Sequence, residues 1–130
     1  MGIRKDNGEI EVTELVAPNV RTTTATSAAV DLSKYVRACI IIHAGTITDG
    51  TFTPKIQTSA TSGGSYADDD GTLDSFVANT SSVDDRVTKV DLDIDSVDNR
   101  YMKFVSTVTG SPSTGGAVGA ILVGVLKRAA

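Results

Sequence analysis

The chain has 130 residues, of which 40% are hydrophobic and 22% charged, and its formal net charge at pH 7 is −4. This length and composition predict one folded domain and exclude both wholesale disorder and a fibrous repeat. The acidic balance and the lack of a basic cluster argue against nucleic-acid binding, because phosphate recognition needs grouped Lys and Arg side chains.

The number of cysteines and the length of the apolar segments indicate the compartment in which the chain folds and whether it enters a membrane. Cys39 is the single cysteine, so the sequence predicts no intrachain disulfide and fits folding in a reducing cytoplasm. Residues 1–9 are charged and lack an apolar core, and the longest apolar run, residues 117–126, is about half the length of a spanning helix. We therefore expect neither a secretory signal nor a membrane anchor.

Turn signals divide the N-terminal half into strand-length segments. Residues 1–18 predict an extended arm or a short strand, which Pro18 ends, and the β-branched residues 20–26 predict a partly exposed strand. Residues 31–35 resemble a tight turn or one helical turn. The continuous apolar centre of residues 36–44 then predicts a central strand that is buried on both faces.

The middle of the chain alternates more clearly. Phe52, Pro54 and Ile56 alternate with polar residues and predict a half-buried strand, which Pro54 should place at a sheet edge or a bulge because it has no N–H to donate. A weaker strand is expected over residues 72–77. Residues 90–95 alternate apolar side chains with aspartates, which predicts a strand with one dry and one wet face.

Two more strands are expected toward the C-terminus. Residues 101–109 predict one, and residues 117–126 are apolar on both parities, as in a strand that is covered or that meets a partner. The count is seven or eight antiparallel strands, with no helical periodicity. We predict an all-β, antiparallel two-sheet β-sandwich (jelly-roll or Ig-like) over residues 19–130, with a small β-barrel as the alternative.

Residues suited to catalysis or metal binding are few. His43, the one histidine, ends an apolar strand, and a Ser or Cys nucleophile would normally need such a base within reach. Asp68, Asp69 and Asp70 lack the alternating ligand spacing of a calcium loop and fit a solvated turn better. We predict no enzymatic activity, no catalytic residue, no cofactor and no metal site.

The N-terminal segment offers a candidate partner-binding element. A strand that precedes the compact domain can add to the sheet edge of another chain, and its apolar side chains would then meet the partner. These are Ile10, Val12, Leu15 and Val16. A terminal strand that pairs within its own domain is an equally good interpretation, and the apolar last strand has the same two interpretations.

Several segments resemble a group of small structural proteins of tailed bacteriophages, the head decoration or capsid cement proteins. The segments are Val-Asp-Leu at 30–32, Ile-Ile-Ile-His-Ala-Gly at 40–45, Asp-Gly-Thr-Phe-Thr-Pro-Lys-Ile-Gln at 49–57, Ser59, Arg-Tyr-Met-Lys-Phe at 100–104, residues 107–110 and the Ala- and Gly-rich final strand. The resemblance extends over roughly residues 17–126. It departs from the family pattern at residues 83–97, which are more acidic.

The resemblance implies a β-sandwich on the outer surface of the phage head. Such a protein binds the major capsid protein and copies of itself, as a symmetric homo-oligomer, and stabilises contacts between shell subunits without binding nucleic acid or membrane. The acidic charge also favours an outer position over one facing packaged DNA. A tail or head-to-tail connector protein is one alternative. A carbohydrate-binding module for a host surface is another, although sugar platforms need aromatics and the chain has three Tyr, three Phe and no Trp.

Overall fold

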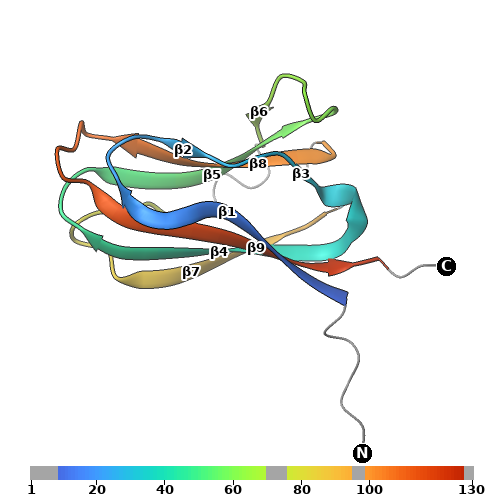
Figure 1. Ribbon diagram of the computed structural model, residues 1–130, viewed down its shortest axis with the longest axis horizontal. Helices are drawn as coiled ribbons and strands as arrows, with labels where there is room; N and C mark the ends of the chain where they lie inside the picture. Colours follow the sequence, from blue (N-terminus) through green and yellow to red (C-terminus); the bar gives the residue numbers. More distant parts are fainter. Residues whose placement is uncertain (1–8, 70–75, 95–98, 128–130) are drawn as a thin grey trace, which may run out of the picture.

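The computed structural model describes residues 9–69, 76–94 and 99–127, which form two β-sheets stacked face to face (Figure 1). The first sheet has four strands in the order β1-β9-β4-β7. Their bounds are β1 Ile10–Arg21, β9 Gly116–Leu126, β4 Tyr35–Ile47 and β7 Arg86–Leu92. All three strand pairs in this sheet are antiparallel.

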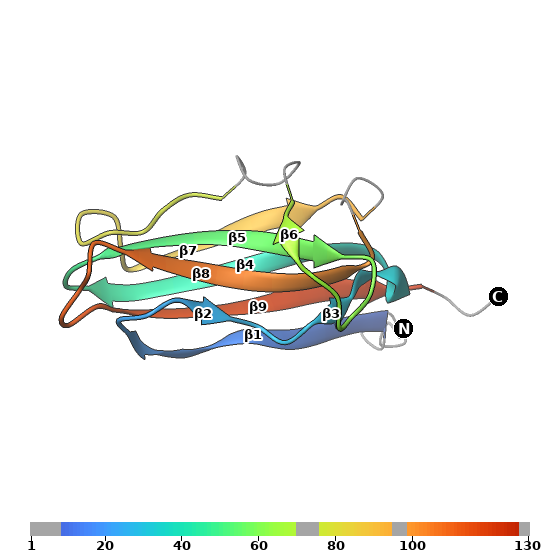
Figure 2. The same ribbon diagram turned by 90° about the horizontal axis from the view of Figure 1, so that it is seen from above.

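The second sheet has five strands, four of them in the order β2-β8-β5-β6, with β3 also paired to β8. Their bounds are β2 Ala25–Thr26, β8 Tyr101–Thr109, β5 Thr51–Ser59, β6 Ala67–Asp68 and β3 Val30–Asp31. The strands of the two sheets run in similar directions (Figure 2), as in aligned sandwich packing. The predicted antiparallel β-sandwich is therefore confirmed, and the barrel alternative is wrong because the sheets stay open.

Alternating side chains fill the space between the sheets. Ile40 and Ile42 of β4 and Phe104 and Met102 of β8 belong to one buried cluster between the sheets, and each of these side chains is at most 2% exposed. Phe76 packs edge-on against Phe104, with ring centroids 6.4 Å apart. Full burial of one such side chain contributes roughly 1.5–3 kcal/mol, so this layer supplies much of the folding free energy.

The start of strand β4 is fixed by a buried tyrosine. Tyr35 is fully buried, and its ring occupies the space that a side chain at Gly124 would need. The Tyr35 hydroxyl donates a 2.6 Å hydrogen bond to Glu11 Oε1 of β1, and Lys34 Nζ lies 2.7 Å from the same oxygen. These contacts link the start of β1, β4 and the end of β9 at one end of the sandwich.

Most predicted elements are present. The turn before β4 is a 3-10 helix, η2 Leu32–Lys34, capped by the Asp31 side chain. Pro54 pairs with Ser106 of β8 on one side, and on its other side the two-residue β6 pairs only with Gln57 and Thr58. Pro54 therefore lies at an effectively open edge, as predicted.

Two predicted segments are divided differently in the structure, and a third lies mostly outside the described residues. The boundary predicted at residue 18, between an arm and a sandwich domain, falls inside β1, which pairs with β9 from Ile10 to Arg21. Residues 20–26 divide between the end of β1 and the short β2. Residues 70–75, which hold most of the weaker strand expected at 72–77, lie outside the described residues, and residues 76 and 77 are not in a strand.

Candidate interaction surface

The side chains of the four-stranded sheet that point away from the core are mostly apolar. On β9, Val118, Ala120 and Leu122 are buried in the core, and the alternate residues therefore point outward. The register places outward residues of neighbouring strands side by side. We define the outer apolar surface as Ile10, Val12 and Val20 of β1, Ala117, Ile121, Val123 and Val125 of β9, Cys39 and Ile41 of β4, and Val87 of β7.

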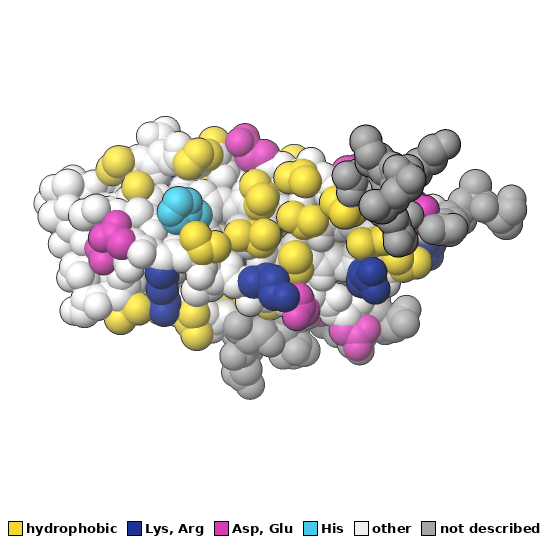
Figure 3. All heavy atoms as spheres, turned by 90° about the horizontal axis from the view of Figure 1, so that it is seen from below, with side chains coloured by type: hydrophobic (Ala, Val, Ile, Leu, Met, Phe, Trp, Pro, Cys, Tyr) yellow, Lys and Arg dark blue, Asp and Glu magenta, His cyan; other side chains and the backbone are white. Residues whose placement is uncertain are grey.

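These residues form rows across the sheet. In the central row Ile121 lies between Glu14 of β1 and Ile41 of β4, and Ile41 is followed by Lys89 of β7. The neighbouring row runs through Val12, Val123 and Cys39 to Asp91. Figure 3 shows the result, a continuous band of hydrophobic side chains on this face.

The outer apolar surface is exposed most strongly on the edge strands β1 and β7 and partly on the central strands. Val12, Val20 and Val87 are 61%, 62% and 60% exposed, and the central residues Ile41 and Ile121 are half-buried. The whole outward face of the sheet, charged residues included, covers roughly 500 Å² in projection, for four strands at a spacing of about 4.8 Å and eight residue rises of about 3.4 Å. An apolar patch of a few hundred Å² is about the largest that a soluble monomer exposes, and such patches often mark interaction sites.

Charged groups border this surface instead of interrupting its centre. Glu14 lies on edge strand β1, and Lys89 and Asp91 lie on edge strand β7, where Lys89 Nζ is 3.2 Å from Asp91 Oδ1. Arg37 and His43 are exposed toward the two ends of the β4 segment. An apolar centre with a polar rim is the usual organisation of a protein–protein interface.

The surface is also hollowed near Gly119. Pro18 of β1 lies over this glycine, and a Cβ at Gly119 would come within 3.0–3.2 Å of Pro18 atoms. Hollows on either side of Pro18 are lined by His43 and Gly119 together with Val20 or Val87. His43, the only histidine, stands exposed beside them (Figure 3).

The outward face of the five-stranded sheet has the opposite character. The register there pairs Thr51 with Thr109, Thr53 with Thr107 and Gln57 with Lys103. Most of these side chains are half-buried or exposed, and all six are polar. Polar side chains of this kind are typical of a sheet face that stays in contact with water. The five-stranded sheet therefore has no apolar surface comparable with that of the four-stranded sheet.

The predicted partner-binding residues divide between surface and interior. Ile10 and Val12 lie on the outer apolar surface, 46% and 61% exposed, whereas Leu15 and Val16 are 7% and 4% exposed. Register shifts between Glu14 and Val16 and beyond interrupt the ladder with β9 here. Among the described residues β1 pairs only with β9, so its other edge stays open, and strand addition at that edge remains a prediction.

Sequence reasoning predicts the surface only for the last strand, where contact with a partner is one of two open interpretations, and misses the outward residues of β4 and β7. Residues 36–44 and 117–126 are both apolar on both parities, but for residues 36–44 this pattern predicts burial on both faces. In the structure the outward parity, such as Cys39, Ile41 and Val123, is only half-buried. The second layer that this pattern predicts is not supplied by the described part of the chain.

The candidate chemical groups are far apart or engaged elsewhere. Cys39 and His43 share the outward face of β4 but lie four residues apart, about 14 Å at the rise of a strand, too far for a nucleophile–base hydrogen bond. Asp68 accepts a hydrogen bond from Gln57 and pairs with Lys55 Nζ at 2.9 Å, while Asp69 is buried. Asp70 and Asp95 lie outside the described residues, and within those described no cluster of three His, Cys, Asp or Glu residues could hold a metal.

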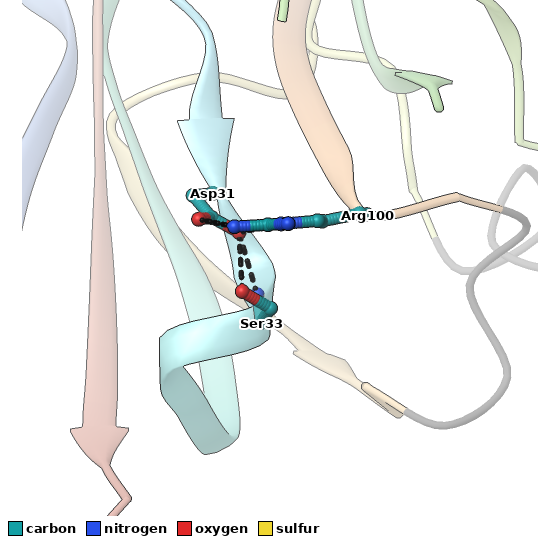
Figure 4. A network of polar contacts seen from close by, with 3 residues as sticks. All are labelled: Asp31, Ser33 and Arg100. Atoms are coloured by element: carbon teal, nitrogen blue, oxygen red, sulfur yellow. Dashed lines mark hydrogen bonds and ion pairs between the residues drawn. The ribbon is translucent and has the colours of Figure 1, made fainter. Parts of the chain in front are cut away.

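Two polar networks fix the loops at the ends of the five-stranded sheet. Arg100 donates two hydrogen bonds, of 2.9 and 2.8 Å, to the Asp31 carboxylate, which also accepts from the Ser33 backbone and hydroxyl (Figure 4). These hydrogen bonds hold the pKa of Asp31 well below its usual range, and the hydrogen bonds from Arg100 have the largest effect. At the other end, Asp49 accepts from the backbone N–H groups of Gly115, Ser113 and Thr114, which lowers its pKa.

Comparisons with known proteins show the fold. No protein-family model matches the chain, and neither does any curated protein. Among solved structures, the PBSX exported protein XepA is similar over 100% of this chain and 41% of XepA, with 11% identity and a TM-score of 0.60. The SPBc2 prophage-derived protein YomS is similar over 89% of this chain and 94% of YomS, with 14% identity and a TM-score of 0.51.

A weaker similarity, with a TM-score of 0.43 and 14% identity, is to the family 22 carbohydrate-binding module of Clostridium thermocellum Xyn10B, over 95% of this chain and 90% of the module. The chain thus spans less than half of XepA and nearly all of YomS. No helix within the described ranges is long and apolar enough to cross a membrane. At these identities the chain shares with XepA and YomS a β-sandwich fold.

Proposed function

We propose that the chain is a non-enzymatic structural protein of a tailed-phage particle, which works by binding protein through its outer apolar surface. The observation that carries the proposal is the half-exposed apolar face of the four-stranded sheet, centred on Ile41 and Ile121. Removal of this face from water stabilises a complex by roughly 25 cal/mol per Å² before the costs of association, so a protein partner with a matching apolar face is favoured.

The phage assignment is supported by two independent likenesses. The sequence resembles head decoration proteins, and the fold is similar to a protein whose name places it in the SPBc2 prophage. The finer proposal is a decoration protein on the outer head surface, which binds the assembled shell and stabilises it by mass action. Its acidic charge of −4 suits that outer position.

A carbohydrate-binding role has less support from the site geometry. Sugar rings stack on open aromatic faces, and the half-buried Tyr66 and Tyr101 are the tyrosines available on the five-stranded sheet. Lys103 Nζ lies 4.5 Å from the centre of the Tyr66 ring, and Arg100 lies 5.0 Å from that of Tyr101. A sugar would have to displace these cations.

The test is to locate the chain in purified particles of the phage or prophage that encodes it. Quantitative mass spectrometry and electron cryomicroscopy should find it on the outer head surface, in a copy number comparable with that of the shell subunit. A few copies at the tail or the head-to-tail junction would replace the decoration role by a connector role. Complete absence from particles that otherwise assemble normally would contradict the proposed function.

A further inference from the structure

We infer that the protein partner of the outer apolar surface is a second copy of this chain, packed sheet to sheet about a two-fold axis parallel to the strands. The choice of a protein partner rests on the proposed function, and the choice of a second copy rests on the register. A two-fold interface is self-complementary, so each contact between unlike residues occurs twice.

The register determines which residues would meet. An axis that runs between β9 and β4, in the plane of the interface, places β9 of one copy over β4 of the other and β1 over β7, while each row stays opposite itself. Ile121 then meets the partner's Ile41, and Val123 meets the partner's Cys39. The two most apolar strands cover each other, which supplies the second layer expected from their two-sided apolar sequences.

Charge complementarity selects this orientation. In the central row the edge residues are Glu14 on β1 and Lys89 on β7, so the axis along the strands places each Glu14 opposite the partner's Lys89. An axis across the strands would instead place Glu14 over Glu14 and Lys89 over Lys89. Like charges that face each other at an interface are strongly unfavourable, so the second arrangement is rejected.

The shape of the surface agrees with the same pairing. The exposed His43 of β4 lies in one row with Gly119 of β9, beside the hollows next to Pro18. Since β4 packs over the partner's β9, each His43 lies opposite the partner's Gly119, beside the hollows that flank the partner's Pro18. An exposed side chain that faces a hollow in the same row is complementary on a two-fold axis.

The area suffices for a specific dimer. Two faces of roughly 500 Å² in flat projection give about 1,000 Å² together, near the lower limit for a specific interface, and the side-chain relief adds to it. Val12 opposite the partner's Asp91 and Val125 opposite the partner's Arg37 are the poorest contacts. Asp91 is 75% exposed at the rim and Arg37 is exposed toward the end of β4, so both charges can stay in water. The dimer leaves the polar five-stranded sheets of both copies exposed to solvent, on opposite sides of the interface.

The test is a charge swap followed by sedimentation equilibrium on the full chain. Glu14 and Lys89 lie on opposite edges of the sheet, about 14 Å apart, so they form no pair within one chain. Glu14→Lys and Lys89→Glu should each weaken the wild-type dimer about tenfold or more, because each places like charges together twice. A mixture of the two variant chains should form a one-to-one heterodimer, because both charge pairs are then restored.

Thr53→Lys, on the polar face, is the matched control and should leave dimerisation unchanged. Thermal melting establishes that each variant folds, which is expected because both altered side chains are exposed. The inference is overturned if the wild-type chain stays monomeric up to roughly 100 μM, or if the mixture is no tighter than either variant alone. A monomer that is still found in particles overturns only the dimer, and a dimer that is absent from particles overturns only the proposed function.

Discussion

The two outward faces of this sandwich differ although each belongs to an antiparallel sheet over the same core. On the five-stranded sheet, Thr53, Lys55 and Gln57 of β5 alternate with buried Phe52, Pro54 and Ile56, so each strand has one dry side and one wet side. On the four-stranded sheet, the centres of β4 and β9 are apolar on both sides, and their outward residues Cys39, Ile41, Ile121 and Val123 are only half-covered. A strand needs only one apolar set of alternate side chains, the set that faces the core, to build this fold. A second apolar set on the outward side is explained by contact with a partner.

The polar face also shows that a solvent-exposed sheet face in this fold can consist of polar side chains. The apolar composition of the other face therefore needs a separate explanation. Both faces have similar strand geometry, and β5 and β8 show that threonine, lysine and glutamine are accommodated in it. β-branched residues favour strands, but threonine satisfies that preference as well as valine or isoleucine does. The choice of Val and Ile on the outer apolar surface is therefore explained by contact and not by strand propensity.

The largest expected effect is on association. Ile121→Lys places a charge in the centre of the outer apolar surface, where Glu14 of the neighbouring strand can pair with it in the free chain but a packed interface would desolvate it. Binding to a second copy or to particles should weaken by about 100-fold, as for a central interface residue. Sedimentation equilibrium and particle pull-down measure the two cases.

Thr107→Lys is the matched change on the polar face. Thr107 is half-buried on β8, and a lysine there can extend into solvent. If Thr107→Lys weakens association as much as Ile121→Lys does, the contrast between the two faces has no functional meaning.

A smaller effect is expected on stability. It tests whether residues of the four-stranded sheet's outward face are packed against one another, as Gly119 and Pro18 are, or are simply exposed to solvent. Gly119→Val adds a side chain where Pro18 backbone and ring atoms leave only 3.0–3.2 Å for a Cβ. Displacement of β1 should lower the free energy of unfolding by about 1–3 kcal/mol, as overpacking does. The nearly isosteric Thr107→Val on the polar face should change it by less than about 0.5 kcal/mol. Urea denaturation of both variants measures the difference, and equal effects would contradict it.

The single cysteine provides a probe of the same contrast. Cys39 is partly exposed at the centre of the outer apolar surface, so a thiol reagent should modify it in the free chain. The modification rate should fall about tenfold when the chain is concentrated enough to associate, because only the free form reacts. Thr107→Cys in a Cys39→Ser background should react at a rate independent of concentration. Concentration-independent modification of Cys39 would show that its face stays open.

Sequence patterns predicted the fold well and the surface only in part. Alternation identified β5 and, at residues 90–92, the end of β7, which begins earlier, at Arg86. The Gly- and Asp-rich turns separated the strands, so the two-layer architecture followed from local signals. The surface depends on which strands become neighbours: Ile121 and Ile41 lie side by side although they are far apart in sequence. Glu14 and Lys89 face the same way only because β1 and β7 form opposite edges of one sheet, and alternation within one segment does not contain that information.

The smallest expected effect concerns the ion pairs near the two faces. Arg100 holds the pKa of Asp31 below its ordinary value, so the carboxylate stabilises the fold fully at pH values above about 5, and the stabilisation is lost as the pH falls through about 4 and below. Asp31→Asn should therefore lower the melting temperature at pH 6 and reduce its decline toward pH 3. Asp91 pairs with Lys89 at the border of the outer apolar surface, where the two side chains are 75% and 59% exposed, and such pairs contribute little. Asp91→Asn should therefore leave the melting temperature at pH 6 unchanged, and an equal loss at pH 6 in both variants would show that the two pairs do not differ in this way.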